Sequence, residues 1–285
     1  MTDRARAKSN NASTAKGRSH GRALALLALA AFAAYGGFSA FETMPTTDQR
    51  IWVVVLVCAA VSSIAGFAFS ALAGSVLFHI SADTLYVVQV MLVASVAVQA
   101  YSVWQLRRDL RAKPLLPYFA GGAPTVLPGI FLLLHTPVSL YTMALGAFLI
   151  GYATFMLAKP TFRLSDDSVL GRVTVGALGG ITGATAAFPG AFITIWCGAQ
   201  GWEKRRQRAI YQPFILGMQL LTLTALTLLQ PRDALQLDIL KFTAPALMGA
   251  YCGLRVFDGL STAQFNKLVA VFLFLSGMAL SLRTL

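Results

Sequence analysis

The sequence is poor in charge and in cysteine. Only 12% of its 285 residues are charged, with 11 acidic residues against 23 lysines and arginines. With 56% hydrophobic residues and a mean hydropathy of +0.67, this composition excludes an ordinary soluble domain, whose helices carry polar stripes. The cysteines Cys58, Cys197 and Cys252 lie in apolar segments and form no paired motif, so neither a metal site nor a disulfide framework is expected.

Several catalytic motifs are also absent. The chain contains neither HExxH nor the phosphate loop GxxxxGK[ST], and its central apolar segments hold no Asp or Glu. An enzyme acting at membrane depth needs a reactive group there. We therefore expect no enzymatic activity, no cofactor and no metal, and the same lack of carboxylates argues against a midplane proton relay.

Long apolar runs dominate what is present. Runs of about 20 residues recur, each long enough to cross a hydrocarbon core of about 30 Å, and they lack the alternation of β-barrel strands. The expected fold is an all-α polytopic membrane protein. The apolar segments are 23–41, 51–79, 85–105, 114–135, 138–158, 171–198, 210–229, 238–257 and 263–283.

The basic residues gather in blocks beside these segments. Most of the 23 lie at 1–22, 107–113, 159–172 and 204–208. The positive-inside rule places such blocks in the cytoplasm and explains the net charge of +12 without a nucleic-acid partner. Residues 1–22 are expected to be a disordered cytoplasmic tail. Residues 23–41 are either an uncleaved transmembrane helix, which we favour, or the apolar region of a signal sequence.

Two segments must enter and leave on the same side. Three apolar segments separate the tail from 107–113, and three more separate 107–113 from 204–208, so three full crossings would place cytoplasmic blocks on opposite sides. The longest segments, 51–79 and 171–198, also contain the helix-breaking stretches "SSIAGFAFSALAG" and "GALGGITGATAAFPG". We interpret both as re-entrant helical hairpins.

This interpretation divides the chain into two transmembrane repeats, 51–158 and 171–283. Each consists of a broken hairpin followed by three helices, after an extra N-terminal helix. Because the first repeat starts outside and the second inside, we expect inverted repeats. That plan is typical of secondary transporters, whose substrate site lies at the midplane between broken helices.

Residues 50–283 resemble the TauE/SafE sulfite exporter family. Four stretches carry the resemblance: "GFAFSALAGSVLFHI" at 66–80, "YFAGGAPTVLPGIFLLLHTP" at 118–137, "GGITGATAAFPGAFITI" at 179–195 and "APALMGAYCGLRVFDGLS" at 244–261. The glycine run common in the family's first motif is reduced here to Gly66 and Gly74, which leaves the substrate open. The resemblance implies export of sulfite, sulfoacetate or a related organosulfonate across the bacterial cytoplasmic (inner) membrane.

An anion at the midplane can be held by the N-terminus of a broken helix, whose backbone N–H groups are free. Glycine lets the backbone approach, and Ser, Thr, Tyr and Gln add donors. The expected substrate-binding residues are Ser70, Gly74, Ser75, Tyr86, Gln89, Gly180, Thr182, Gly183, Thr185, Tyr211 and Gln212. Two other interpretations stay open: close helix packing through the small residues, and interfacial anchoring by the two tyrosines.

The basic block after the second hairpin also allows two interpretations. Lys204, Arg205, Arg206 and Arg208 either gather cytoplasmic anions or serve only as the usual topology determinants. The expected function is a secondary anion exporter, whose partners are the small anion and the lipid bilayer. An anion channel and a non-transporting assembly subunit are the alternatives, and the sequence does not specify the oligomeric state.

Overall fold

The computed structural model describes residues 41–65, 68–81, 83–158, 167–229 and 237–256, and the positions 267, 270, 271, 273–275, 277, 278 and 281. The chain forms two compact units, 1–44 and 45–285, and every helix named below belongs to the second. The expected tail, residues 23–40 of the segment 23–41 and most of 263–283 lie outside the described residues.

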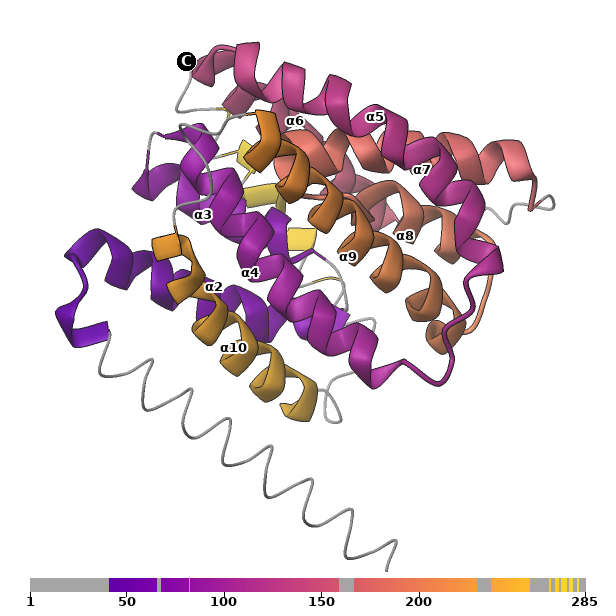
Figure 1. Ribbon diagram of the computed structural model, residues 1–285, viewed down its shortest axis with the longest axis horizontal. Coiled ribbons are helices and arrows are strands. Elements are labelled where there is room, and N and C mark those ends of the chain that lie inside the picture. The colour runs from indigo at the N-terminus through magenta and orange to yellow at the C-terminus, as the bar shows by residue number, and fades with distance from the viewer. Residues whose placement is uncertain are drawn as a thin grey trace, which may run out of the picture. The chain divides into compact units, whose positions relative to one another are not determined.

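All regular elements of the described residues are helical. In chain order they are α2 (Thr46–Ala65), α3 (Phe69–Ile80), α4 (Thr84–Gln105), the 3-10 turn η1 (Lys113–Leu115), α5 (Leu116–His135), α6 (Val138–Ala158), α7 (Val169–Ala186), α8 (Gly190–Ala199), α9 (Lys204–Leu229), η2 (Leu237–Phe242) and α10 (Thr243–Val256) (Figure 1). Four stretches within the described ranges are long and apolar enough to cross a membrane: Thr84–Gln105, Lys113–His135, Ser139–Ala158 and Arg205–Leu229. The expected class, a polytopic helical membrane protein, agrees with these spans.

Both long apolar segments are interrupted. The first divides into α2 and α3, and Ala68 at the junction has a φ of 72°. The second divides into α7 and α8, where Ala187 has a φ of 53°. Among the described residues, these two alanines are the only non-glycine residues with positive φ. The left-handed conformation costs an alanine about 1–2 kcal/mol, so the surrounding packing must hold both interruptions in place.

Pro189 explains the second interruption. Proline has no N–H group and disfavours helical backbone at the residue before it, so α7 ends at Ala186 and α8 begins at Gly190. The N–H of Phe188 donates to the carbonyl oxygen of Thr182 at 3.1 Å, which satisfies one acceptor at the end of α7.

The helices α5 and α7 pack with their backbones in direct contact. A Cβ atom on Gly121 would lie 1.9 Å from the carbonyl oxygen of Val173, and one on Gly129 would lie 3.1 Å from that of Ile181. Because the residue numbers rise together, the two helices run in the same direction. Only glycine allows this approach at Gly121.

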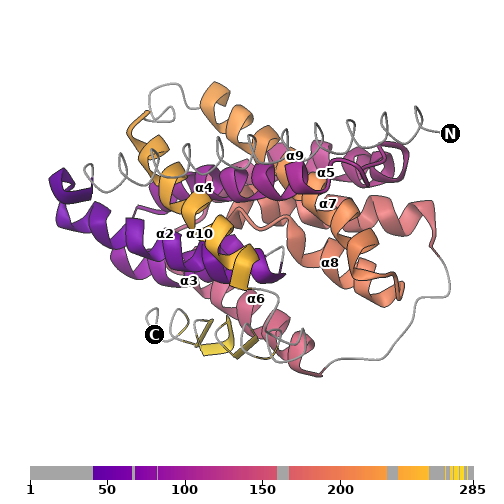
Figure 2. The ribbon, with the colours of Figure 1, turned by 90° about the horizontal axis from the view of Figure 1, so that it is seen from below.

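A second parallel pair joins α2 to α10. A Cβ atom on Gly249 would lie 2.2 Å from the carbonyl oxygen of Leu56, and one on Gly253 would lie 2.0 Å from that of Ala60. The two helices lie next to each other in both views (Figure 1 and Figure 2). The first helix of each expected repeat therefore packs along a helix of the other.

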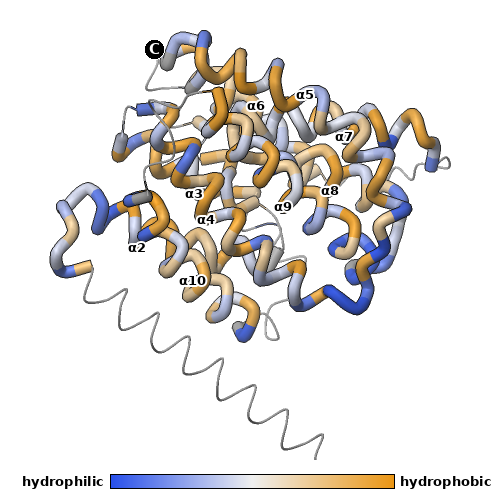
Figure 3. Tube along the Cα trace, viewed as in Figure 1, coloured by the Kyte–Doolittle hydropathy of each residue, from blue (hydrophilic) through white to orange (hydrophobic). Residues whose placement is uncertain are grey.

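The helices α4 and α9 form an antiparallel pair. Arg205, near the start of α9, pairs with Asp109 beyond the end of α4, at 2.7 Å. Gln219 contacts Ser95 near the middle of both helices, at 2.6 Å. In these contacts the residue numbers rise along α9 as they fall along α4, so the two helices run in opposite directions. The loop joining α4 to α5 is hydrophilic, whereas the helices beside it are largely hydrophobic (Figure 3).

Candidate functional site

Polar side chains meet inside the helix packing where α9 approaches both α4 and the second interruption. Gln219 Nε2 donates to Ser95 Oγ at 2.6 Å and to the carbonyl oxygen of Ala187 at 3.3 Å. Gln219 is 1% exposed and Ser95 2%. One amide group thus connects the antiparallel helix pair to the backbone of the interruption.

Two further polar side chains are buried on the same two helices. Gln99 Oε1 and Thr222 Oγ1 have no hydrogen-bond partner among the described residues. A buried polar atom without a partner costs about 1–3 kcal/mol, so such atoms mark places where water or a ligand would be stabilised. Sequence reasoning missed this cluster. The available signal was the presence of polar residues within the apolar runs 85–105 and 210–229.

At the first interruption, Ser70 differs from the other expected residues. It lies in the first turn of α3, is 4% exposed, and its Oγ has no partner among the described residues. Ser75 Oγ instead donates to the carbonyl oxygen of Leu72 at 2.7 Å. Gly74 lies against α4, since a Cβ atom there would come 2.9 Å from Met91 Sδ.

At the second interruption, the expected glycines provide close packing. A Cβ atom on Gly180 would lie 2.3 Å from the carbonyl oxygen of Gly122 in α5, and one on Gly183 would lie 2.9 Å from Pro189 Cβ. Both glycines are buried. Their backbone is therefore covered by neighbouring protein atoms.

The expected threonines use their hydroxyl groups within α7. Thr182 Oγ1 donates to the carbonyl oxygen of Leu178, and Thr185 Oγ1 donates to that of Ile181, each at 2.9 Å. The carbonyl oxygen of Thr185 also accepts a hydrogen bond of 2.7 Å from the Tyr141 hydroxyl in α6. An anion would compete with these internal bonds for either threonine hydroxyl.

The expected tyrosines lie at different levels of the helix pair. Tyr86 OH donates to Asp48 Oδ1 at 3.3 Å, whereas Tyr211 is buried near Arg208. In the antiparallel register set by the Ser95–Gln219 contact, Tyr211 is level with Val103, 17 residues along α4 from Tyr86. At 1.5 Å per residue this separates the levels by about 25 Å.

The two expected glutamines are separated in the same way. Gln89 is 6% exposed and Gln212 2%. In the same register Gln212 is level with Ser102, which is about 20 Å along α4 from Gln89. The structure thus does not bring the paired residues of the two halves to one point. It brings Gln219 and Ser95 together instead.

An ion cluster joins the start of α2 to η2. Lys241 Nζ lies 2.6 Å from Asp48 Oδ2 and also pairs with Asp238. Burial lowers the pKa of Lys241, but the hydrogen bonds to Asp238 and Asp48 and the negative charges of these two carboxylates together outweigh that effect and raise the pKa above its ordinary value. Together with Tyr86, this cluster links three segments that are distant in sequence.

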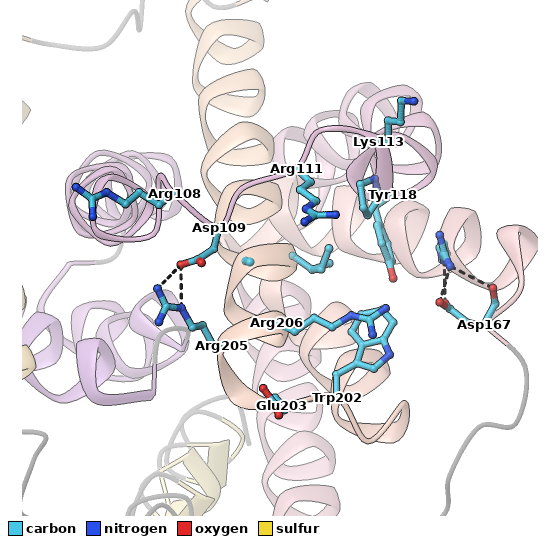
Figure 4. A pocket seen from close by; sticks show the side chains of 14 residues that line it. Arg108, Asp109, Arg111, Lys113, Tyr118, Asp167, Trp202, Glu203, Arg205 and Arg206 are labelled. Atoms are coloured by element: carbon cyan, nitrogen blue, oxygen red, sulfur yellow. Dashed lines mark hydrogen bonds and ion pairs between the residues drawn. The ribbon is translucent and has the colours of Figure 1, made fainter.

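A basic cavity of about 770 Å³ lies elsewhere, between η1 and the first turns of α5, α7 and α9 (Figure 4). Its lining residues are Arg108, Asp109, Arg111, Lys113, Pro114, Tyr118, Asp167, Arg172, Trp202, Glu203, Arg205, Arg206, Ala209 and Ile210. None of the expected substrate-binding residues is among them. The arginines of the 204–208 block that line it, Arg205 and Arg206, were expected only to gather anions or to set topology.

Two ion pairs neutralise part of this lining. Arg172 Nε donates to Asp167 Oδ1 at 2.8 Å, and this hydrogen bond raises the pKa of the Arg172 guanidinium. Arg205 Nε donates to Asp109 Oδ2 at 2.9 Å. Within the described ranges, no group of three His, Cys, Asp or Glu side chains gathers closely enough to hold a metal ion.

The helical spans, the interrupted helices and the buried polar side chains define a multi-pass membrane protein. Residues 51–280 match the family model described as sulfite exporter TauE/SafE. Since the match covers most of the chain, the protein belongs to this family, whose members are transporters and not enzymes. The resemblance drawn from the four sequence stretches is thereby confirmed. No curated protein and no solved structure matched the chain.

Proposed function

We propose that this protein is a secondary transporter that exports a small sulfur-containing anion, such as sulfite, sulfoacetate or a related organosulfonate, across the bacterial cytoplasmic membrane. The observation that carries the proposal is the pair of helix interruptions at Ala68 and Ala187, both in apolar segments of a sulfite exporter family member. Interrupted helices place free backbone groups at membrane depth, where they are tolerated only when they are buried in protein or line a water-filled cavity.

We propose further that 51–158 and 171–283 are inverted repeats. Helix α5 packs parallel to α7, helix α10 packs parallel to α2, and α4 packs antiparallel to α9. If the two halves are exchanged, the α5–α7 pair takes the place of the α10–α2 pair, and the α4–α9 pair takes its own place. Reciprocal packing of this kind supports a two-fold relation in the membrane plane, with both broken segments re-entrant and the basic blocks cytoplasmic.

The anion site that we propose lies between the two interruptions. At the first, the N-terminus of α3 offers free N–H groups, a partial positive charge and the buried Ser70 hydroxyl. At the second, the N-terminus of α8 follows Pro189, and Gln219 adjoins Ala187. The remaining expected residues shape the backbone around these termini or lie further along α4 and α9.

Counterflow in proteoliposomes tests the proposal. Vesicles containing the purified protein are loaded with unlabelled sulfite or sulfoacetate, and the uptake of labelled anion is followed against protein-free vesicles. A carrier gives transient, saturable accumulation. A channel gives flux without accumulation, and an assembly subunit gives no flux. Either of the last two results, obtained with folded protein across a panel of sulfonates, carboxylates and inorganic anions, contradicts the proposal.

A further inference from the structure

The basic cavity carries more positive charge than its own acids neutralise. Six lysines and arginines line it against three carboxylates. Arg172 and Arg205 have ion pairs, with Asp167 and Asp109. Arg111 and Arg206 have no ion pair among the described residues, although the Arg206 guanidinium carbon stacks 4.2 Å from the centre of the Trp202 ring. The cavity therefore has an unbalanced positive field.

The two unpaired arginines point into one space. Figure 4 shows the guanidinium groups of Arg111, before η1, and Arg206, in the first turn of α9, directed into the region beside the hydroxyl end of Tyr118. Lys113 and Arg108 point away from this region. Planar guanidinium groups bind oxyanions through paired N–H donors, so this geometry suits a ligand with several acceptor oxygens.

Tyr118 supplies an observation independent of the charge. Its side chain is 0% exposed, it lines the cavity, and its hydroxyl has no hydrogen-bond partner among the described residues. The indole N–H of Trp196 lies near this hydroxyl without reaching hydrogen-bond geometry, and it too has no partner among these residues. A buried hydroxyl without a partner is unfavourable, and a ligand oxygen would satisfy it.

We propose that this cavity binds a soluble oxyanion through Arg111, Arg206 and the Tyr118 hydroxyl, as a loading site separate from the helix interruptions. The assignment of the ligand as the transported anion rests on the proposed function. Gly176 in α7 marks the level of Tyr118, because a Cβ atom on Gly176 would lie 2.1 Å from the carbonyl oxygen of Tyr118. Gly176 lies 11 residues before Ala187. The backbone of Tyr118 thus lies about 16 Å along α7 from the level of the second interruption, far enough for two separate binding events.

Binding to the purified full-length protein tests the site. Sulfite and sulfoacetate are titrated calorimetrically into the wild type, Arg111→Gln, Arg206→Gln and Tyr118→Phe. Arg107→Gln is the matched control, because it removes the same charge from the same block but does not line the cavity. The first two variants should weaken binding about tenfold or more, as expected for loss of a charge-assisted hydrogen bond, and Tyr118→Phe about fivefold.

Three results would overturn the site. Unchanged affinity in all three cavity variants removes these residues from binding, and an equal loss in Arg107→Gln shows only general attraction of anions. Phospholipid that copurifies with the wild type but not with the arginine variants, and that sulfite does not displace, identifies a lipid phosphate as the occupant. Thermal unfolding and gel filtration establish that each variant is folded.

The same variants separate this inference from the transport proposal. If the wild type shows counterflow, and Arg111→Gln and Arg206→Gln show the same counterflow and the same affinity for the anion, the loading site is contradicted and the transport proposal is not. If the wild type binds the oxyanion and the two arginine variants do not, but the wild type shows no counterflow, the loading site is supported and the transport proposal is contradicted. Inorganic phosphate serves as a third titrant, and binding at least as tight as that of sulfite contradicts a site for the transported sulfur anion.

Discussion

Gln219 in α9 donates a hydrogen bond to Ser95 in α4, 124 residues earlier in the chain, and the two side chains are almost fully buried. The same amide reaches the carbonyl oxygen of Ala187, where α7 ends. Each half of the chain thus contributes one polar side chain to a contact at the second interruption. The Gln219 side chain therefore links the α4–α9 packing to the backbone between α7 and α8.

The first prediction concerns this contact. Gln219→Met keeps the volume and removes both hydrogen bonds, and it should lower the free energy of unfolding by about 1–2 kcal/mol. The measurement is denaturant-induced unfolding in detergent micelles. Gln105→Met is the control, because Gln105 is exposed and bonds only to Tyr101 within α4. Equal destabilisation by the two substitutions would show that the buried contact has no special role.

The second prediction concerns the two parallel helix pairs. Gly176→Ala and Gly253→Ala each place a methyl group about 2 Å from a carbonyl oxygen of the facing helix, 2.1 Å at Tyr118 and 2.0 Å at Ala60. A backbone oxygen cannot rotate away, so each substitution should cost about 2–3 kcal/mol or more. Folded yield in fluorescence-detected gel filtration, with the melting temperature, measures the effect.

Gly151→Ala provides the matched control for these glycines. Nothing lies within 4 Å of the position of its added Cβ, and alanine favours helix over glycine by about 1 kcal/mol. This variant should be as stable as the wild type or slightly more stable. A loss of stability equal to that of Gly253→Ala would show that close approach to a facing carbonyl oxygen does not explain the losses at Gly176 and Gly253, because helix propensity alone favours alanine.

Sequence patterns predicted the fold in more detail than the site. The number of apolar segments between the basic blocks, together with the helix-breaking residues, singled out 51–79 and 171–198. Both segments are interrupted, at Ala68 and around Ala187. Proline chemistry accounts for the second position, since Pro189 prevents α7 from continuing. The first interruption occurs at an alanine, which no local rule favours in the left-handed conformation.

The site was harder to predict from the sequence, because a motif of small residues does not indicate which hydroxyl group lacks a hydrogen-bond partner. Ser70 and Ser75 look equivalent in the sequence, yet only Ser75 bonds to its own helix. In the sequence, Gly180 suits close approach of the backbone to a ligand as well as close helix packing, but in the structure it contacts Gly122 of α5. Such distinctions depend on the tertiary register. That register also brings together Ser95 and Gln219, which no spacing rule connects.

The third prediction concerns the ion cluster at α2 and η2. Lys241→Met leaves two carboxylates, Asp48 and Asp238, without their cation, whereas Asp48→Asn leaves Lys241 paired with Asp238. We expect the lysine variant to lose about 1–3 kcal/mol of unfolding free energy and the aspartate variant less. The double variant should be less destabilised than the sum of the two single variants.

Arg205→Met is the control for this cluster, because its side chain is 73% exposed and an exposed ion pair contributes about 1 kcal/mol or less. Thermal unfolding of all four variants in one detergent provides the comparison. Strict additivity of the two single substitutions would show that Asp48 and Lys241 do not interact energetically, despite their distance of 2.6 Å.

The last prediction separates fold from binding at the first interruption. Ser70→Ala removes a buried hydroxyl that has no partner, so the fold should be unchanged or slightly more stable. If Ser70 binds the anion, the increase in melting temperature produced by sulfite or sulfoacetate should shrink in this variant. Thr182→Val should weaken anion binding too, but less, because the Thr182 hydroxyl already bonds to Leu178.

Ser75→Ala is the control for Ser70→Ala. It lies five residues further along the same helix, is equally buried, and bonds only to the carbonyl oxygen of Leu72. Its anion-dependent stabilisation should match that of the wild type. If Ser70→Ala also retains the full effect of the anion, the first interruption does not contribute this hydroxyl to the site. Binding would then have to depend on the backbone N–H groups of α3 or on the second interruption, where Gln219 is the side chain to vary next.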